Sequence, residues 1–405
     1  MHILFITDNF PPEVNAPASR TYEHCREWVK EGHDVTVITC APNFPQGEVY
    51  EGYKNRLYQK EEVDGIEVIR VWSYITSNDG FIKRTLDYFS FAVSSFFAGL
   101  FEKADVIVAT SPQFFTTWSG WLLSKCRRKP WVFELRDLWP ESIKTVGALD
   151  DGMIYRMLEA IELFLYRSAD LVVPVTDAFK KNLTDRDIPS NKQLVVPNGS
   201  NLELFNTSKN GNGSDIRREM GLEDRFVVGY IGTHGLAHNL DFILECVREV
   251  PDEEFHFIFI GDGAEKEKLV NYAQAQNINN VSFLDPVPKE EVPQYLASVD
   301  VSLVPLKKTD TFKTVIPSKI FEAAAMDTPI LLGVEGQAQE IIEEYDAGLC
   351  FDPENKSDFL STLEKLKEDK KLYNQIVENT QDLAQAYDRK KLARQMLDTL
   401  QKLKK

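Results

Sequence analysis

Short apolar runs alternate with longer helical patterns along the whole chain. In the first half these runs are rich in β-branched residues and end in Asp, Ser, Thr, Pro or Gly. Such runs are typical of central strands in a parallel sheet, because those strands are buried on both faces. The predicted strands are Ile3–Ile6, Val35–Thr39, Val106–Ala109, Trp131–Glu134, Leu171–Val175 and Leu194–Val196.

The second half repeats this plan, and its length and 43% apolar residues are enough for a second core. The pattern predicts two doubly wound α/β domains, residues 1–200 and 201–385, in which ligands bind at the carboxyl ends of the strands. Thr207–Ser214 is rich in Gly, Asn and Ser and predicts a flexible end of the linker between them. The strands of the second half are predicted at Val227–Ile231, His256–Ile260, Val281–Phe283, Val301–Val304 and Ile330–Leu332.

The composition limits which binding partners and which cellular compartment can be expected for the protein. The net charge of −17 argues against nucleic acid, because binding a phosphate backbone needs a basic face. Five widely spaced cysteines, with no C-x-x-C pair, indicate reduced thiols. Met1–Ile6 has no basic run and no cleavage-like site, which predicts a buried strand rather than a signal peptide. We therefore expect a cytoplasmic protein.

Phe81–Phe101 is the stretch that bears on membranes. Its uncharged part from Tyr88 is shorter than the roughly 20 residues that span a bilayer, so we do not expect a transmembrane helix. Two interpretations stay open: a buried core helix, or a helix whose Phe-rich face dips into the inner surface of the cytoplasmic membrane. Basic residues at Lys83, Arg84 and 125–129 favour the second, as does the milder charge of residues 1–200, −5 against −12 for the rest.

Pro317–Glu322 carries the most specific chemistry. A Pro and a Ser that can cap a helix precede Lys319, and Glu322 lies three residues further on the same face. The first helical turn and Lys319 suit a diphosphate, while Glu322 can accept hydrogen bonds from the two hydroxyls of a ribose. The alternative is an ordinary capped helix with an exposed ion pair.

A second cluster, Arg136, Asp137 and Trp139, directly follows a predicted strand. Asp137 could orient or deprotonate an acceptor hydroxyl, Arg136 could bind diphosphate and Trp139 could stack on a sugar. The alternative is a buried Arg–Asp pair with Trp139 in the core. For Asp185–Asp187, which resembles a metal-binding carboxylate pair, a solvated loop is favoured, and we expect no metal site.

The order of short motifs resembles glycosyltransferase family 4. This resemblance implies a GT-B fold: two Rossmann-like domains facing across a cleft, with a C-terminal helix near 386–405 returning to the first domain. It covers essentially the full length of the chain. The motifs are Pro11–Pro12, Asn15–Pro17, Ala169–Val172, Val196–Gly199, Gly229–Gly232, Ile260–Gly263, Ala297–Val301, Pro317–Glu322 and Ala347–Leu349.

Within that family, the chain is similar to a subgroup of fucosamine and other N-acetyl-aminosugar transferases of bacterial O-antigen and capsule biosynthesis. The resemblance implies transfer of an aminosugar from a UDP donor to a polyprenyl-diphosphate-linked acceptor, with retention and without metal or cofactor. The marks of the subgroup are Pro11–Glu13, Ala16–Ala18, Arg20, Glu134–Pro140, Gly232–Gly235 and Pro317–Lys319 with Glu322.

The resemblance also assigns roles to residues. It implies donor binding by Gly232, Thr233, His234, Gly261, Pro317, Ser318, Lys319, Glu322, Gln339 and Glu340. Acceptor binding is expected from Asn15, Ala16, Arg136, Asp137 and Trp139, and the catalytic residues are expected to be Asp137, Lys319 and Glu322.

Two departures from the family pattern affect the donor site. Thr314 stands where the first of two Glu residues is usual, and the usual Arg and Lys are missing from Gly232–Leu240. How the donor sugar is held is therefore open, because Thr314 offers only a neutral hydroxyl. A UDP-sugar epimerase and a non-catalytic nucleotide- or lipid-binding partner remain alternatives to a transferase.

Overall fold

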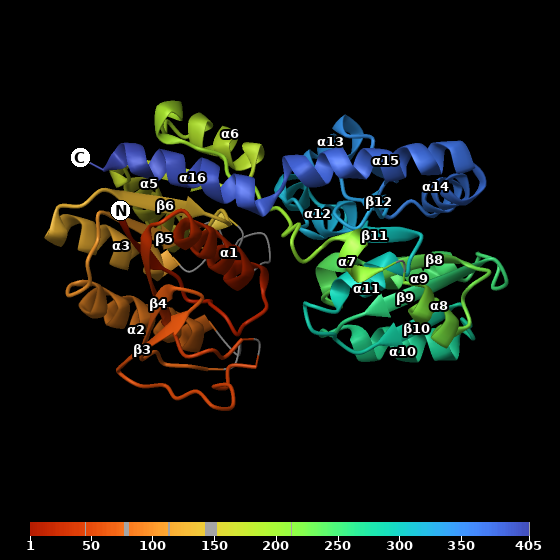
Figure 1. Ribbon diagram of the computed structural model, residues 1–405, viewed down its shortest axis with the longest axis horizontal. Helices are drawn as coiled ribbons and strands as arrows, with labels where there is room; N and C mark the ends of the chain where they lie inside the picture. Colours follow the sequence, from red (N-terminus) through yellow and green to blue (C-terminus); the bar gives the residue numbers. More distant parts are fainter. Residues whose placement is uncertain (45, 77–80, 112–113, 142–151, 212, 405) are drawn as a thin grey trace. The chain divides into compact units, whose positions relative to one another are not determined.

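The computed structural model describes residues 1–44, 46–76, 81–111, 114–141, 152–211 and 213–404 (Figure 1). The chain forms two compact units. Unit 1 holds Met1–Asn198 and Arg389–Lys405, and unit 2 holds Gly199–Asp388. The last helix of the chain is therefore part of the first unit.

Unit 1 is built on a seven-stranded sheet in the order β3-β4-β2-β1-β5-β6-β7. Only β3 is antiparallel to its neighbour, and all other pairs are parallel. Because those strands point the same way, their carboxyl ends lie at one edge. The strands are β1 His2–Ile6, β2 Asp34–Cys40, β3 Tyr58–Val63, β4 Ile66–Val71, β5 Val106–Thr110, β6 Trp131–Leu135 and β7 Leu171–Pro174.

Alternate residues of the central strands enter two different cores. Ile3 and Phe5 pack with α1 and α16, whereas Leu4 and Ile6 pack with α2, α3 and α5. This alternation follows from the two-residue period of a strand and places helices over both faces of the sheet. The helices of unit 1 are α1 Ala16–Lys30, α2 Phe81–Gly99, α3 Phe114–Arg127, α5 Met153–Ser168, α6 Asp177–Asp185, the 3-10 turn η1 Ser190–Lys192 and α16 Arg389–Leu403.

Two features of this sheet differ from the sequence prediction. The hairpin β3–β4 was not predicted, although Asp64 and Gly65 at its turn both have positive φ and form a recognised hairpin signal. Leu194–Val196 was predicted as a strand but forms none. The Leu194 and Val196 amides donate hydrogen bonds to the Val172 and Pro174 carbonyls of β7, without regular pairing beyond a single bridge.

Unit 2 contains a six-stranded, wholly parallel sheet in the order β10-β9-β8-β11-β12-β13. The five predicted strands are present, and the short β13 at its edge adds a sixth. The strands are β8 Phe226–Ile231, β9 Phe255–Ile260, β10 Val281–Leu284, β11 Val301–Pro305, β12 Ile330–Gly333 and β13 Gly348–Cys350.

Helices cover this second sheet. Part of the segment that was predicted to be a flexible linker forms one of the helices of unit 2. Thr207–Asn210 forms α7, and the Thr207 hydroxyl donates to Asp327 at 3.0 Å. Asn212 lies outside the described residues. The helices and 3-10 turns of unit 2 are α7, α8 Ser214–Met220, η2 Leu236–His238, α9 Leu240–Val247, α10 Lys266–Ala275, α11 Val292–Ala297, η3 Asp310–Thr314, α12 Lys319–Ala324, α13 Gln337–Glu344, α14 Lys356–Glu368 and α15 Lys370–Ala386.

The C-terminal helix α16 packs against α1 in unit 1, as Figure 1 shows. Met396 and Leu400 are fully buried in the core on this face of the sheet. The Trp28 indole of α1 donates to the Ala393 carbonyl at 2.8 Å, and Arg394 pairs with Glu31 at 2.5 Å. The apolar contacts supply most of the free energy, since exposed ion pairs contribute little.

Truncating Met396 should therefore destabilise the protein. Met396→Ala removes a fully buried side chain and leaves a cavity, so we expect a loss of about 2–5 kcal/mol in the free energy of unfolding. Urea unfolding followed by circular dichroism would measure it. Gln395→Ala, an exposed position on the same helix, is the matched control and should change stability by less than about 0.5 kcal/mol. Equal unfolding midpoints of the two variants would contradict the packing described.

Candidate functional site

Loops after the strands of unit 2 meet at the carboxyl edge of its sheet. The Gly232 amide donates to Ile260 at 2.8 Å, which continues the pairing of β8 and β9 past the strand ends. Gly232 and Gly261 have φ of 147° and 142°, a backbone region that favours glycine. A Cβ on Gly261 would lie 2.0 Å from the Gly232 carbonyl oxygen. The two glycines predicted at the donor site are therefore in direct contact.

Lys319 reaches this edge from the first turn of α12. A Cβ on Gly232 would lie 2.5 Å from the Lys319 ammonium, which in turn lies 4.0 Å from the centre of the Tyr230 ring. In the described part of the chain, this ammonium makes no hydrogen bond and no ion pair. Burial lowers the pKa of Lys319 to about 7, and the charge of Glu322 offsets this only in part. Lys319 is therefore a titratable amine near neutral pH, and a nearby anion would favour its charged form.

The start of α12 differs from the sequence expectation. Ser318 occupies the N-cap position, but its side chain makes no capping hydrogen bond. The Pro317 and Ser318 carbonyls accept from the Ile320 and Phe321 amides at 3.2 and 3.1 Å. The start of this helix was expected to offer free amides to a phosphate, and two amides of its first turn are already engaged. Most of the positive charge offered here therefore comes from Lys319.

Glu322 has a partner that sequence reasoning missed. Lys289, in the loop after β10, donates to the Glu322 carboxylate and lies 4.9 Å from the centre of the Phe205 ring. The signal for Lys289 was its place just after a parallel strand, where binding residues gather. We call Tyr230, Gly232, Lys289, Lys319 and Glu322 the Lys319 site.

Thr314 stands where the first Glu of the family pattern is usual. Thr314 ends the 3-10 turn η3, and its hydroxyl donates to the Thr311 carbonyl at 2.9 Å. The side chain is therefore used within its own turn. In this conformation Thr314 does not replace the hydrogen-bonding capacity of a carboxylate.

His234, predicted to contact the donor, has a fully buried ring. It packs against Tyr230, Phe259 and Phe283, with ring centres 5.8–6.4 Å apart. Burial, reinforced by Lys266 and Lys319, lowers the pKa of His234 to about 4, so the ring is neutral at pH 7. The ring thus serves as a neutral core group, while the neighbouring Thr233 is exposed.

The loop before α13 approaches the same region with a tight turn at Gly336. A Cβ on Gly336 would lie 2.3 Å from the Lys313 carbonyl oxygen. Two residues predicted at the donor site lie on the first turns of α13. The Gln339 side chain donates to Glu343 at 2.8 Å on the same helix, and Glu340 is exposed. Their place at the donor site stays a prediction.

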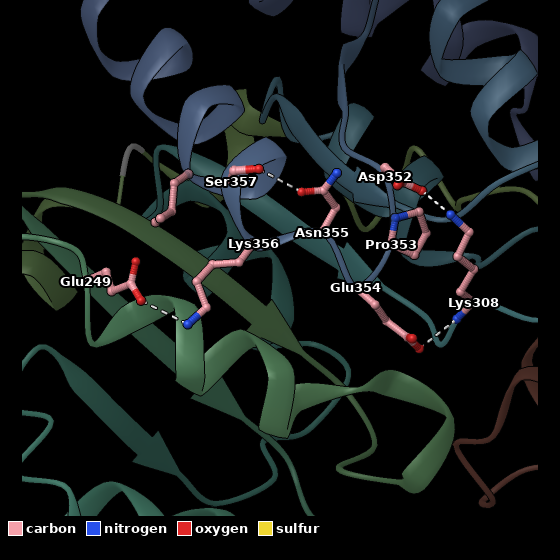
Figure 2. Close-up of a pocket in the computed structure, with 9 residues that line it drawn as sticks. Glu249, Lys308, Asp352, Pro353, Glu354, Asn355, Lys356 and Ser357 are labelled. Carbon is pink, nitrogen blue, oxygen red and sulfur yellow. Dashed lines mark hydrogen bonds and ion pairs between the residues drawn. The ribbon is translucent and has the colours of Figure 1, made fainter.

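A hollow of about 700 Å³ lies on unit 2 apart from these residues (Figure 2). Figure 2 shows that its charged groups are paired, Lys308 with Asp352 at 2.5 Å and Lys356 with Glu249 at 2.9 Å. It is wide open and includes neither Lys319 nor Glu322. Because its lysines already have carboxylate partners, we do not assign a ligand to it.

In unit 1, Asn15 and Ala16 begin α1. Asn15 is the N-cap, with φ of −68°, and its side-chain oxygen accepts from the Ala18 amide at 2.9 Å. Its side-chain nitrogen donates to Asn9 at 2.8 Å. The expected tight turn is thus a capped helix start, a conformation that Asn and Ala adopt without a left-handed residue.

A buried ion pair that was not predicted lies behind Arg136. Arg20 donates to Glu134 at 2.9 Å, and each side chain is 1% exposed. Arg20 also donates to the Val196 and Pro197 carbonyls at 2.8 and 2.6 Å, which fixes the last segment of unit 1. Burial alone would raise the pKa of Glu134, but the charges of Arg20 and Arg136 lower it. The buried ion pair that the structure shows beside β6 is therefore Arg20–Glu134, which the sequence did not indicate.

Arg136 and its neighbours follow β6 as predicted. Burial, with Arg20 and Arg389 nearby, lowers the pKa of Arg136 to about 10, although Glu134 opposes the shift. The Arg136 and Asp137 amides donate to the Ser111 hydroxyl at 2.9 and 3.4 Å. One Arg136 nitrogen, Nη1, is buried without a hydrogen-bond partner within the described chain. This guanidinium is the one predicted to bind acceptor diphosphate.

Trp139 is placed differently from the sequence hypothesis. Its ring stacks on Phe114, with centres 4.4 Å apart and planes at 24°, at the margin of the unit 1 core. One face of the indole is thereby occupied. The core interpretation of Trp139 fits this packing better than stacking on a sugar.

The Asp185–Asp187 segment contains an arginine with its own partners. Arg186 donates to Glu162 and Glu159 on α5 at 2.9 and 3.3 Å. Among the described residues, no group of three or more His, Cys, Asp or Glu side chains is arranged to hold a metal ion.

Two family models match consecutive parts of the chain. Residues 15–199 match the glycosyl transferase 4-like domain, and residues 214–383 match the glycosyl transferases of group 1. WcaI of Escherichia coli, assigned to colanic acid biosynthesis as a glycosyl transferase, is 25% identical over 88% of this chain and 89% of its own length.

Solved structures share the fold over the full length. Sucrose-phosphate synthase from Thermosynechococcus elongatus superposes with a TM-score of 0.80 at 17% identity, covering 99% of this chain and 98% of its own. Anabaena HepE, solved with UDP and glucose, has a TM-score of 0.73 at 18% identity, covering 99% and 100%. The two sheets, the two family matches and the likeness to solved structures agree with one another. The chain therefore belongs to the group 1, GT4-like family of glycosyltransferases with the GT-B fold.

Proposed function

We propose that this glycosyltransferase moves an N-acetyl-aminosugar, of the 6-deoxy fucosamine type, from a UDP donor to a polyprenyl-diphosphate-linked acceptor in surface polysaccharide biosynthesis. The relative assigned to colanic acid biosynthesis supports a polysaccharide product. The structural relative solved with UDP and glucose supports a uridine nucleotide donor. The aminosugar and the lipid-linked acceptor rest on the sequence resemblance.

The observation that carries the donor assignment is the Lys319 ammonium beside Gly232, with Glu322 one helical turn further on. A diphosphate at the sheet edge would supply the anion that Lys319 lacks. Glu322 would exchange its hydrogen bond with Lys289 for the ribose hydroxyls, and Lys289 would then be free for a phosphate oxygen. Because Gly232 and Gly261 have no side chains, the nucleotide could approach their backbone closely.

In the proposed reaction, the bond between the anomeric carbon and the diphosphate oxygen breaks while the acceptor oxygen bonds the same face of that carbon. The hydroxyl proton of the acceptor leaves to the departing diphosphate. Lys319 stabilises the negative charge that develops on this leaving group, and no protein nucleophile or metal is required in the proposal. Asp137 orients the acceptor hydroxyl, and Arg136 binds the acceptor diphosphate.

Removing the Glu322 carboxylate should weaken UDP binding. Glu322→Ala loses two charge-assisted hydrogen bonds to the ribose, so we expect an increase in Kd of about 10- to 100-fold. Calorimetric titration with UDP measures it, and GDP is the control nucleotide. Glu344→Ala removes an exposed carboxylate from α13 and should leave Kd unchanged. Absence of UDP binding, or equal affinities of the Glu322→Ala variant and the unaltered protein, would refute the donor site.

Binding of UDP should also take up a proton. Lys319 has a pKa of about 7 in the free protein, so at pH 8 it is mostly neutral, and a bound diphosphate raises this pKa by stabilising the ammonium. Affinity should be greatest near and below pH 7 and should fall by up to about tenfold per pH unit above it. The second ionisation of phosphate lies near pH 6, below this window.

Titrations at pH 8 in two buffers of different ionisation enthalpy measure this proton uptake. The observed binding enthalpy should differ between the buffers for the unaltered protein and agree between them for Lys319→Met. Lys308→Met is the control, because that lysine lines the separate hollow and pairs with Asp352. If UDP binds with no proton uptake in the unaltered protein, Lys319 does not contact the diphosphate.

A further inference from the structure

Helix α2 carries apolar side chains on two opposite faces. One face is buried against the sheet and includes Phe91 and Ala98. The opposite face carries a stripe of large apolar side chains at helical spacing, exposed to 50%, 54%, 40% and 59%. These residues are Leu86, Phe89, Val93 and Phe97. A buried core helix therefore explains the buried face of α2 but does not explain the exposed stripe.

A groove runs between α2 and α3, the two helices that pack together most extensively in unit 1. Its volume is about 310 Å³, and its walls are almost entirely apolar. Phe89 and Phe115 meet edge to face in it, 5.9 Å between ring centres. With the exposed stripe of α2, the groove forms what we call the α2–α3 surface, lined by Phe89, Val93, Phe97, Phe115, Trp118 and Leu122.

Basic side chains border this surface. Lys83 and Arg84 are exposed on the first turn of α2, and Lys125 and Arg128 are exposed at the end of α3. Lys125 lies three residues after Leu122, on the same side of α3. The acidic Asp87 on α2 is half-buried, and burial, opposed by Arg84, raises the pKa of its carboxyl to about 7. The α2–α3 surface therefore has an apolar centre and a positively charged border.

We propose that the α2–α3 surface docks on an anionic phospholipid bilayer. In this arrangement α2 lies in the plane of the interface, its exposed stripe enters the acyl region, and the groove takes up an acyl chain. The four basic side chains contact anionic headgroups. A second copy of this chain fits less well, because a two-fold contact through this surface would bring the same cations against one another.

The proposal goes beyond sugar transfer, and its test needs neither nucleotide nor sugar. It is also compatible with the absence, in the described part of the chain, of any helix long and apolar enough to cross a bilayer. A surface helix needs only one apolar side and a favourable charge.

Vesicle flotation of the full chain tests the apolar part. We expect binding to vesicles that contain phosphatidylglycerol, and a loss of more than about tenfold for Phe89→Gln combined with Phe97→Gln. Leu57→Gln is the matched control, because Leu57 is 81% exposed in unit 1 outside this surface. Circular dichroism and thermal unfolding must show that the double variant is folded.

Charge substitutions test the second part. Lys125→Gln and Arg128→Gln should each weaken binding about fivefold at low salt, and Lys402→Gln, which removes an exposed charge from α16, should not. Binding should weaken as salt rises and should be much lower on pure phosphatidylcholine.

Three results would overturn the proposal. The first is no flotation with anionic vesicles, and the second is undiminished flotation of the folded double variant. The third is a concentration-dependent dimer in sedimentation experiments that the same double variant dissociates, since that would assign the surface to a second copy of the chain. UDP binding is unaffected by any of these results, so they leave the proposed donor site untouched.

Discussion

Parallel pairing of strands is the constraint on which both units depend. In unit 2 every strand runs in the same direction, so all loops that follow the strands gather at one edge of the sheet. Gly232 follows β8, Gly261 follows β9 and Lys289 follows β10, while Lys319 comes from the connection between β11 and β12. Gly232 and Lys319, separated by almost 90 positions, thus lie side by side. An antiparallel arrangement would send alternate loops to opposite edges and could not assemble this site.

The two units handle buried charge in opposite ways. In unit 1, Arg20 and Glu134 form a buried pair, and the remaining Arg20 nitrogens donate to backbone carbonyls. Such a pair resists change, because removing one partner leaves the other charge buried and uncompensated. In unit 2, burial lowers the pKa of Lys319 to about 7, and among the described residues its ammonium has no hydrogen-bond acceptor. A group in that state gains most when an anion arrives, which is the electrostatic basis of the proposed donor site.

Helix α2 contributes one face to the core of unit 1 and another face to its surface. Its buried face contributes Phe91 to the unit 1 core, so the helix must lie against the sheet whatever else it does. Leaving Phe89 and Phe97 exposed on the other face costs solubility unless something covers them, and contiguous apolar patches on proteins usually mark contact sites. Membrane docking would bring the enzyme to an acceptor that is itself anchored in lipid, which relates the two proposals without making either depend on the other.

The sequence by itself determined the two α/β units and ten of the strands, and it placed Lys319 and Glu322 together on the first turn of one helix, because apolar runs and helix-start residues are local signals. It predicted a hydroxyl cap at Ser318, which the structure lacks, and it left open whether Trp139 stacks on a sugar or lies in the core, where packing on Phe114 favours the core. It did not predict that the His234 ring is fully buried. Only the folded structure paired Arg20 with Glu134 and Lys289 with Glu322, across 114 and 33 positions. Whether a polar side chain is buried, paired or free depends on neighbours that are distant in the chain, and no local pattern records them.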